Sequence, residues 1–295
     1  MVRHPKCKCR DSSVKFQKKG FTMTNVFVDL SADALIRVST DHYFDSFTCY
    51  SVVPDVEVYE GEDMIRVVSP GIPNWLTNTV LRCCLSDDNA DTVIDETNEY
   101  FYSRGVLPYW RLCPGDLPSD LGERLVKKGL SLVEEQPAMA VDLQKLNQNI
   151  QMPDEFIVER VTDAATMKEK HGWIHQFGVG KSLGALVMDL FTAYGFHPDS
   201  DWQHYIGVLH GKPVAWASVF YATGVAGIYA VGTLSEARRQ GIGSAITLQA
   251  LLDARERGYH VGVLQSSEMG YNVYLRLGFA TCFKIKTYVR AGSQT

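Results

Sequence analysis

The sequence of 295 residues lacks an apolar run long enough to cross a membrane as a helix. Its first 20 residues are rich in lysine and arginine, but they are not followed by the apolar segment of a secretory signal. We therefore expect a cytoplasmic protein without membrane contact, in which residues 1–24 form a disordered basic tail. An arm that touches nucleic acid or membrane is the alternative for this tail, and Met23 leaves open whether the first 22 residues belong to the native product.

The cysteines lack the pattern of a disulfide framework, because there are seven of them, an odd number, scattered along the chain. Such a distribution favours a reducing compartment. Cys83 and Cys84 fall in an expected strand and are predicted to be buried packing groups. Cys7 and Cys9 lie close together without the further ligands of a tetrahedral zinc site, so no metal is expected.

The sequence also lacks the excess of positive charge that would point to nucleic acid, since its formal net charge is -5. Apolar residues make up 45% and charged residues 21%, which is typical of a soluble globular protein. The length is sufficient for two domains of ordinary size.

The stretch 227–279 carries the most informative pattern. Residues 228–231 are an apolar, β-prone run, and a helix is expected over 244–257. Between them, Gly241 and Gly243 would let the main chain turn tightly and lie against a bulky ligand. Unpaired N–H groups at the start of the helix, together with the helix dipole, favour a phosphate there.

Two familiar glycine loops do not fit this stretch. A mononucleotide P-loop needs Lys followed by Ser or Thr after its last glycine, whereas Ser244 and Ala245 follow Gly243. A Rossmann fingerprint needs a further glycine where Ile246 stands, and an acid after the next strand, which ends in Gln265. The alternative that the glycines only shape a tight connection stays open on this pattern alone.

The stretch resembles the acyl-CoA-binding core of the GCN5-related N-acetyltransferase (GNAT) superfamily. That family has an Arg/Gln-x-x-Gly-x-Gly/Ala loop after its fourth strand, which Arg238, Gly241 and Gly243 match. It also has a later helix that ends in Tyr-x-x-x-Gly-Phe, which residues 274–279 match in the same order along the chain. The resemblance implies acetyl-CoA as the acyl donor.

The resemblance also implies how the cofactor is held. The backbone of Val231 and Thr233 would bind the pantetheine arm where two strands splay apart, and residues 239–244 would hold the diphosphate through main-chain N–H groups. Many family members have Asn at the position of Ser267, whose hydroxyl would make a similar contact. The complete set of cofactor-binding candidates is Val231, Thr233, Arg238, Arg239, Gln240, Gly241, Ile242, Gly243, Ser244 and Ser267.

Tyr274 is the candidate catalytic residue. A phenol with a pKa of about 10 donates a proton readily to a thiolate of similar basicity, so this tyrosine would protonate the coenzyme A sulfur. Viewed alone, it is equally consistent with a core aromatic near a helix end. Some family members have a glutamate base on the cofactor strand, but residues 225–230 contain no acid. The alternatives for a base are Glu236, Glu268, Asp199 and Asp201, and an amine that arrives neutral would need none.

The order of elements in residues 25–143 repeats that of the C-terminal half, which suggests two copies of one domain. The turn 86–91 of the first copy has three aspartates and neither a glycine pair nor an arginine, so it would repel a diphosphate. We expect a degenerate GNAT-like domain at 25–143, a polar linker at 144–153 and a GNAT acyltransferase domain at 154–295. An unrelated α/β domain is the alternative for the first half.

The expected fold class is α/β, with two tandem GNAT-like domains, each a mixed, mostly antiparallel sheet flanked by helices. The periodicity of apolar residues predicts the following elements. They are hairpins at 56–68 and 202–221, helices at 29–50, 90–104, 121–128, 164–177, 183–194 and 268–276, and strands at 80–85, 107–112, 130–133, 139–143, 156–161, 260–265 and 280–289.

The leading functional hypothesis is an acetyl-CoA-dependent N-acetyltransferase in which a primary amine attacks the thioester directly. The acceptor would be a small molecule or a peptide, and no readable motif identifies it. A non-catalytic acyl-CoA sensor or interaction protein is the alternative. Nucleic acid is not expected as a partner, and both a monomer and a homodimer fit the sequence.

Overall fold

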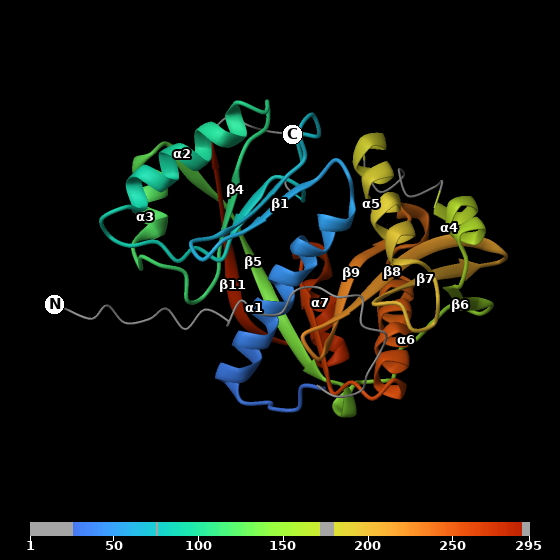
Figure 1. The fold of residues 1–295 in the computed structure, drawn as a ribbon. Coiled ribbons are helices and arrows are strands. Elements are labelled where there is room, and N and C mark those ends of the chain that lie inside the picture. The colour runs from blue at the N-terminus through green and yellow to red at the C-terminus, as the bar shows by residue number, and fades with distance from the viewer. Residues whose placement is uncertain (1–25, 75, 172–179, 291–295) are drawn as a thin grey trace. The chain divides into compact units, whose positions relative to one another are not determined.

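The structure of the protein, a computed structural model, describes residues 26–74, 76–171 and 180–290 (Figure 1). The expected basic tail lies outside the described residues. The chain divides into two compact units, of which the first contains 55–134 and 286–290 and the second contains 26–54 and 135–285. This grouping differs from the expected domain boundaries, because the first helix groups with the C-terminal half. The origin of the chain as two copies joined by a linker at 144–153 stays a prediction.

The first unit contains strands in the order β1-β2-β3-β4-β11. Strands β1 (Glu57–Glu60) and β2 (Ile65–Val68) form the expected antiparallel hairpin. β3 (Thr79–Leu81) is antiparallel to β2 and parallel to β4 (Tyr109–Leu112), which pairs with the end of β11 (Ala280–Arg290). Helices α2 (Ala90–Tyr102) and α3 (Leu121–Lys127) contribute Ile94, Phe101 and Leu125 to the core of this unit.

The second unit contains strands in the order β5-β10-β9-β8-β7-β6. β6 (Phe156–Val161), β7 (Trp202–Leu209), β8 (Lys212–Ala222) and β9 (Val225–Thr233) form successive antiparallel pairs, whereas β9 and β10 (Val261–Gln265) are parallel. The second part of β5 (Leu130–Asp142) is antiparallel to β10. This mixed, mostly antiparallel sheet flanked by helices confirms the expected fold class.

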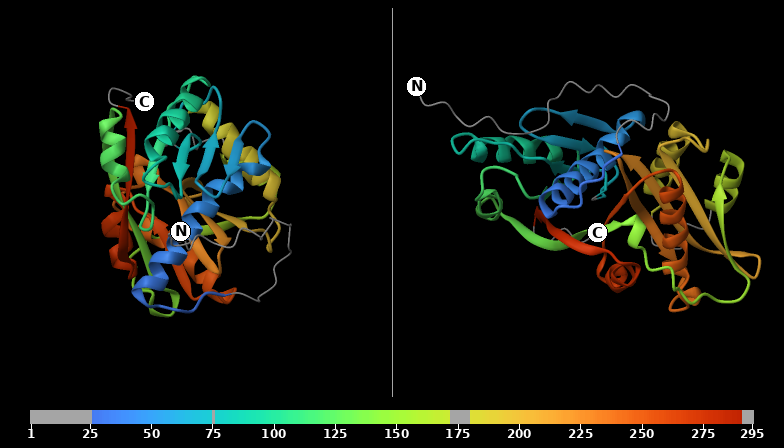
Figure 2. Two further views of the ribbon diagram at one scale, coloured as in Figure 1. Left: turned by 60° about the vertical axis from the view of Figure 1, so that its left-hand side comes forward. Right: turned by 90° about the horizontal axis from the view of Figure 1, so that it is seen from below.

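Helices cover both faces of strand β9, whose successive side chains alternate between the faces. Ala226 and Ile228 share a core cluster with residues of α6 (Ile242–Glu256) and α7 (Glu268–Leu277). Val225 packs on the other face, with Val38 of α1 (Ala32–Thr48). Figure 2 shows α1 and α6 on opposite sides of the strands. Strand β9 is therefore enclosed between α1 and α6.

The region between β6 and β7 contains α4 (Ala164–His171) and α5 (Lys181–Tyr194). The first expected helix of this region extended to residue 177, and residues 172–177 lie outside the described residues. The short 3-10 segments η1 (Cys49–Val52), η2 (Leu143–Lys145) and η4 (Ser235–Ala237) complete the second unit.

Two expectations for strands are wrong. The strands expected at 130–133 and 139–143 are one continuous strand, β5, because the chain stays extended through Pro137, whose carbonyl oxygen accepts a hydrogen bond from Ser266. The strand expected at 80–85 ends at Leu81. The chain turns there, since Arg82 has a left-handed φ of 51° and the N–H of Cys83 bonds to the carboxylate of Asp116.

The two adjacent cysteines after β3 differ. Cys83 is buried and carries a free thiol, as expected. Cys84 is half-buried and disulfide-bonded. The prediction that both are buried packing groups is therefore wrong for Cys84.

Candidate functional site

The parallel strands β9 and β10 separate before β9 ends. They are paired only where Ala226 to Ile228 lie opposite Gly262 to Leu264. β9 continues to Thr233 and stays paired with β8 along its other edge. Within the described residues, the edge of β9 from Tyr229 to Thr233 that points toward β10 has no strand partner. An extended ligand can therefore add to this edge as a further strand.

A bulge interrupts β9 at the same place. Trp216 of β8 lies opposite Gly232, and Ser218 lies opposite Tyr229, so that residues 230 and 231 together face one residue of β8. Ala230 has a φ of 51°, in the left-handed region that residues with a side chain rarely adopt. A bulge leaves an extra residue outside the hydrogen-bond ladder, and its main-chain groups are available to a ligand.

A cradle of main-chain N–H groups follows β9. The loop 238–241 leads into α6 and contains two left-handed residues, Arg239 with a φ of 60° and Gly241 with a φ of 81°. Within the part of the chain that the structure describes, the N–H groups of residues 239–244 have no hydrogen-bond acceptor. Successive unpaired N–H groups in such a turn form a concave anion site, and the dipole of α6 adds positive potential.

The two glycines of this loop have different surroundings. A Cβ atom on Gly241 would lie 2.0 Å from the carbonyl oxygen of Gln151, and the positive φ of this residue also favours glycine. A Cβ atom on Gly243 would meet, among the described residues, just the hydroxyl oxygen of Thr233 at an ordinary 3.5 Å. The space in front of Gly243 is open, so a ligand can approach the main chain closely there.

The other predicted cofactor residues lie around this loop. Nε of Arg238 donates a hydrogen bond to the carbonyl oxygen of Thr233 (3.0 Å), which ties the loop to the end of β9. Residues 239 and 240 are exposed at the rim. Ile242 and Ser244 are buried and can offer a ligand their main-chain groups alone. The structure thus brings the predicted residues from Val231 to Ser244 together at one end of β9.

Ser267 begins helix α7. Its hydroxyl oxygen accepts a hydrogen bond from the N–H of Gly270 (3.2 Å), so it is the N-cap of this helix. The residue is exposed, and within the described residues its hydroxyl hydrogen has no acceptor. It can therefore donate to a ligand without loss of the cap.

Tyr274 lies near the end of α7, before the left-handed C-cap Gly278. Its side chain is 8% exposed and meets the ring of Phe279 edge to face, with centroids 5.8 Å apart. It belongs to the same core cluster as Ile228 and Leu264, which pair where β9 and β10 begin to separate. Burial raises the pKa of the phenol to about 12, so Tyr274 keeps its proton at neutral pH.

The acids considered as bases have different environments. Glu236 and Asp199 are exposed, and Glu236 accepts a hydrogen bond from the Ser235 hydroxyl (3.0 Å), while Asp199 faces His197 at 3.6 Å. Hydrogen bonds from its own N–H and from Ser235 lower the pKa of Glu236. Burial raises the pKa of Asp201. Asp201 is also an exposed residue, and it lies by Tyr221 and Arg257 at the C-terminal end of α6, whereas the N–H cradle is at the N-terminal end of that helix.

A buried histidine that the sequence does not single out contacts the open strand. His42 of α1 hydrogen-bonds to Tyr229, the residue of β9 before the bulge, although the two are 187 positions apart in sequence. The one local signal is Gly227, since glycine inside a strand often marks a close approach of another group. A Cβ atom on Gly227 would lie 2.1 Å from the imidazole of His42.

Comparison with known families agrees with this geometry. Residues 183–279 match the sequence model of the family described as "Acetyltransferase (GNAT) family". The chain carries a GNAT domain. The matched residues include β9, the N–H cradle of α6 and Tyr274. No curated protein matches the chain.

Solved structures of GNAT proteins share the fold over most of the chain. A GCN5-related N-acetyltransferase from Kribbella flavida has a TM-score of 0.66 and 18% identity, and the match covers 90% of this chain and 98% of that one. Another from Sphaerobacter thermophilus has a TM-score of 0.63 and 15% identity, over 92% and 96% of the two chains. A tandem GNAT protein from the clavulanic acid biosynthesis pathway has a TM-score of 0.58 and 12% identity, over 91% and 99%. These likenesses show the fold.

No group of three or more His, Cys, Asp or Glu side chains in the described part of the chain could hold a metal ion, and Cys7 and Cys9 lie outside that part. None of the helices found there is both long and apolar enough to span a bilayer.

Proposed function

We propose that the protein is an acetyl-CoA-dependent N-acetyltransferase in which a primary amine of a small molecule or peptide attacks the acetyl thioester directly. The observation that carries this proposal is the row of unpaired N–H groups at 239–244 beside the open edge of β9. A diphosphate matches the charge of the N–H cradle, and the amide groups of a pantetheine arm match an unpaired strand edge. The expected cytoplasmic location remains part of the proposal.

Each part of the cofactor has a partner in this proposal. The N–H groups from Arg239 to Ser244 hold the diphosphate, and the guanidinium of Arg238 adds positive charge. The main chain of Val231 and Thr233 binds the pantetheine arm along the open edge of β9. The hydroxyl of Ser267 donates a hydrogen bond at the start of α7.

The bulge in β9 supplies stabilisation for the reacting carbonyl. When the amine attacks, the carbonyl oxygen of the thioester becomes an oxyanion. A main-chain N–H at residues 230–231 that is not used by β8 donates to this oxygen. Fixed donors of this kind stabilise the charge that develops in the transition state and need no rearrangement.

Tyr274 supplies the proton for the departing sulfur. As the C–S bond breaks, its electron pair moves to sulfur, the new amide bond remains on the acetyl carbon, and the surplus proton of the amine goes to solvent. A thiol has a pKa of about 8.5, below the value of about 12 for this phenol. Full transfer of the proton from the phenol to the thiolate is therefore uphill. We assign Tyr274 a hydrogen bond to the sulfur, along which the proton moves as the C–S bond breaks. Solvent then returns a proton to the phenolate.

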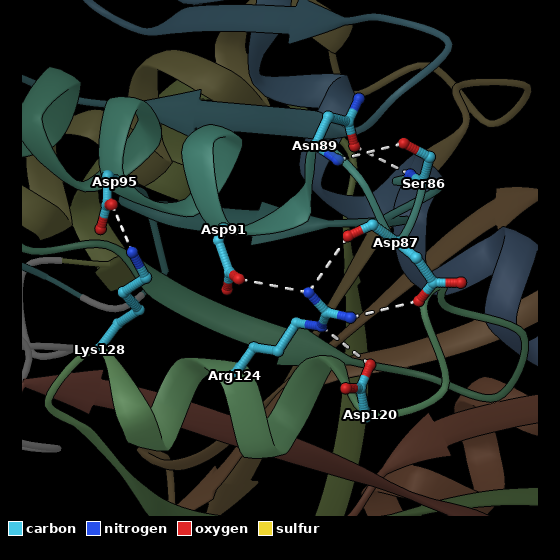
Figure 3. A network of polar contacts seen from close by, with 8 residues as sticks. All are labelled: Ser86, Asp87, Asn89, Asp91, Asp95, Asp120, Arg124 and Lys128. Carbon is cyan, nitrogen blue, oxygen red and sulfur yellow. Dashed lines mark hydrogen bonds and ion pairs between the residues drawn. The ribbon is translucent and has the colours of Figure 1, made fainter.

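We further propose that residues 25–143 are a degenerate copy that does not hold the cofactor. The turn before α2 carries Asp87 and Asp91, whose carboxylates bind Arg124 of α3 at 3.2 and 3.4 Å (Figure 3). At the start of α2, the N–H groups of residues 89 and 90 both bond to Ser86. This turn therefore carries negative charge and fewer unpaired N–H groups than the cradle at 239–244.

Release of free thiol from acetyl-CoA tests the proposal. The full chain is incubated with acetyl-CoA and single amines from a panel of polyamines, aminoglycoside antibiotics and peptides with free N-termini. We expect thiol release that depends on at least one amine, with the acetylated amine detected by mass spectrometry. Bound acetyl-CoA with no amine-dependent release across the panel would favour the alternative of a non-catalytic acyl-CoA sensor.

A further inference from the structure

The imidazole of His42 joins α1 to the two strands beside the bulge. The ring is fully buried, with Nε2 3.0 Å from the carbonyl oxygen of Phe220 in β8 and Nδ1 3.0 Å from the hydroxyl of Tyr229 in β9. A carbonyl oxygen only accepts hydrogen bonds, so Nε2 carries the hydrogen. Nδ1 of the neutral ring then accepts a hydrogen bond from the hydroxyl of Tyr229. The two contacts assign one tautomer to His42.

The shape of β9 is fitted to this ring. Gly227 and Tyr229 lie on the same face of the strand, and a side chain at Gly227 would collide with the imidazole. The rings of His42 and Tyr229 are stacked, with centroids 5.8 Å apart and an interplanar angle of 13°. Tyr229 is thus held on its ring face and at its hydroxyl by His42 of α1.

Tyr229 is the last residue of β9 in regular register before the bulge. It pairs with Ser218, and the following residue, Ala230, takes the left-handed conformation. The direction of the main-chain groups at 230–231 therefore depends on where Tyr229 is held. Under the proposed function, these are the groups that meet the thioester carbonyl.

We propose that His42 is a positioning residue for acyl transfer, which holds Tyr229 and thereby aims the main chain of the β9 bulge at the reacting carbonyl. This inference rests on the proposed function. By this inference, α1 contributes a positioning residue to the site, although it lies outside the residues matched by the GNAT family model. Burial lowers the pKa of His42 to about 4, so the ring stays neutral and keeps this hydrogen-bond pattern at physiological pH.

Two substitutions at His42 separate its two hydrogen bonds. The amide of His42→Asn can place an acceptor oxygen near the position of Nδ1, which keeps the bond from Tyr229. The longer amide of His42→Gln can place a donor near the position of Nε2, which keeps the bond to Phe220 and loses the bond from Tyr229. Both variants bury one neutral amide, so each is a control for the stability of the other.

The test uses the full chain, acetyl-CoA and the most active amine of the panel, with the dissociation constant of acetyl-CoA and the melting temperature measured in parallel. We expect His42→Gln and Tyr229→Phe each to lower kcat about 10- to 100-fold, because small misplacements of donor groups have effects of that size. His42→Asn should retain most of kcat, and the dissociation constant of acetyl-CoA should stay within about twofold in all three. The double variant His42→Gln/Tyr229→Phe should be no slower than either single variant.

Equal loss of kcat in His42→Asn and His42→Gln, in step with their melting temperatures, would overturn the positioning role and leave a structural contact. Full activity of Tyr229→Phe would overturn it as well. Both results leave the proposed function standing, because the unmodified chain still turns over. Binding of acetyl-CoA without any turnover by the unmodified chain would overturn the proposed function and this inference together.

Discussion

Tyr274 is a residue whose chemistry can be separated from its packing. Tyr274→Phe removes the hydroxyl and keeps the ring that meets Phe279 in the core. We expect kcat for thiol release to fall about 10²-fold, because the sulfur loses its proton donor. The dissociation constant of acetyl-CoA, measured by calorimetry, should change little.

A second tyrosine of α7 provides the matched control for that variant. Tyr271 places its hydroxyl 3.2 Å from the hydroxyl of Thr281, and this contact is exposed. Tyr271→Phe should retain full turnover. If Tyr274→Phe releases thiol as fast as the unmodified chain, the assignment of Tyr274 as the acid is wrong.

His42 makes stability depend on pH. Burial lowers its pKa from 6.5 to about 4 in the folded chain, so below pH 6.5 the unfolded chain binds a proton that the folded chain does not. The contribution to the free energy of unfolding is fully present above pH 6.5 and is lost as the pH falls toward 4. The shift corresponds to about 3 kcal/mol.

Urea unfolding at pH 7.5 and pH 4.5 measures this loss, with His42→Asn as the reference because asparagine does not titrate. Between these pH values the unmodified chain should lose about 2 to 3 kcal/mol more than the variant. An equal loss in both chains would show that His42 does not carry this pH dependence.

At the scale of single elements, the loop before α6 can be tested by its two glycines. Gly241→Ala would strain a left-handed residue by about 1 to 2 kcal/mol and press on the carbonyl oxygen of Gln151, so both the melting temperature and the affinity for acetyl-CoA should fall. Gly243→Ala meets just an ordinary contact with Thr233 and should not lower the melting temperature. Thermal unfolding of the two variants decides this. A drop in melting temperature for Gly243→Ala as large as that for Gly241→Ala would contradict the described loop geometry.

The elements that the sequence predicts well are those with local signals. Helix α7 has its N-cap at Ser267 and its left-handed glycine at Gly278, as the motif and capping residues indicate. The bulge at Ala230 has no such signal, because a left-handed alanine is imposed by pairing with β8. The continuity of β5 through Pro137 is likewise set by its neighbours in the sheet, so the sequence alone predicts two separate strands there.

At the scale of the whole molecule, the placement of α1 could not be predicted from the sequence. Its amphipathic pattern indicates a helix, but the pattern does not show which part of the chain packs against the buried face of that helix. His42 meets residues 178 and 187 positions later in the chain, and the compact units follow such contacts and not the order of the sequence. The cradle at 239–244 was predictable because all of its parts lie in one short stretch.

Titration of acetyl-CoA into the folded full chain in a calorimeter tests the central claim most directly. We predict binding heat with a stoichiometry of one acetyl-CoA per chain, because the second half offers the unpaired N–H groups of residues 239–244. The corresponding turn of the first half carries the carboxylates of Asp87 and Asp91, which are paired with Arg124. The absence of heat would contradict the assignment of the cofactor site. A stoichiometry of two would contradict the degenerate first half.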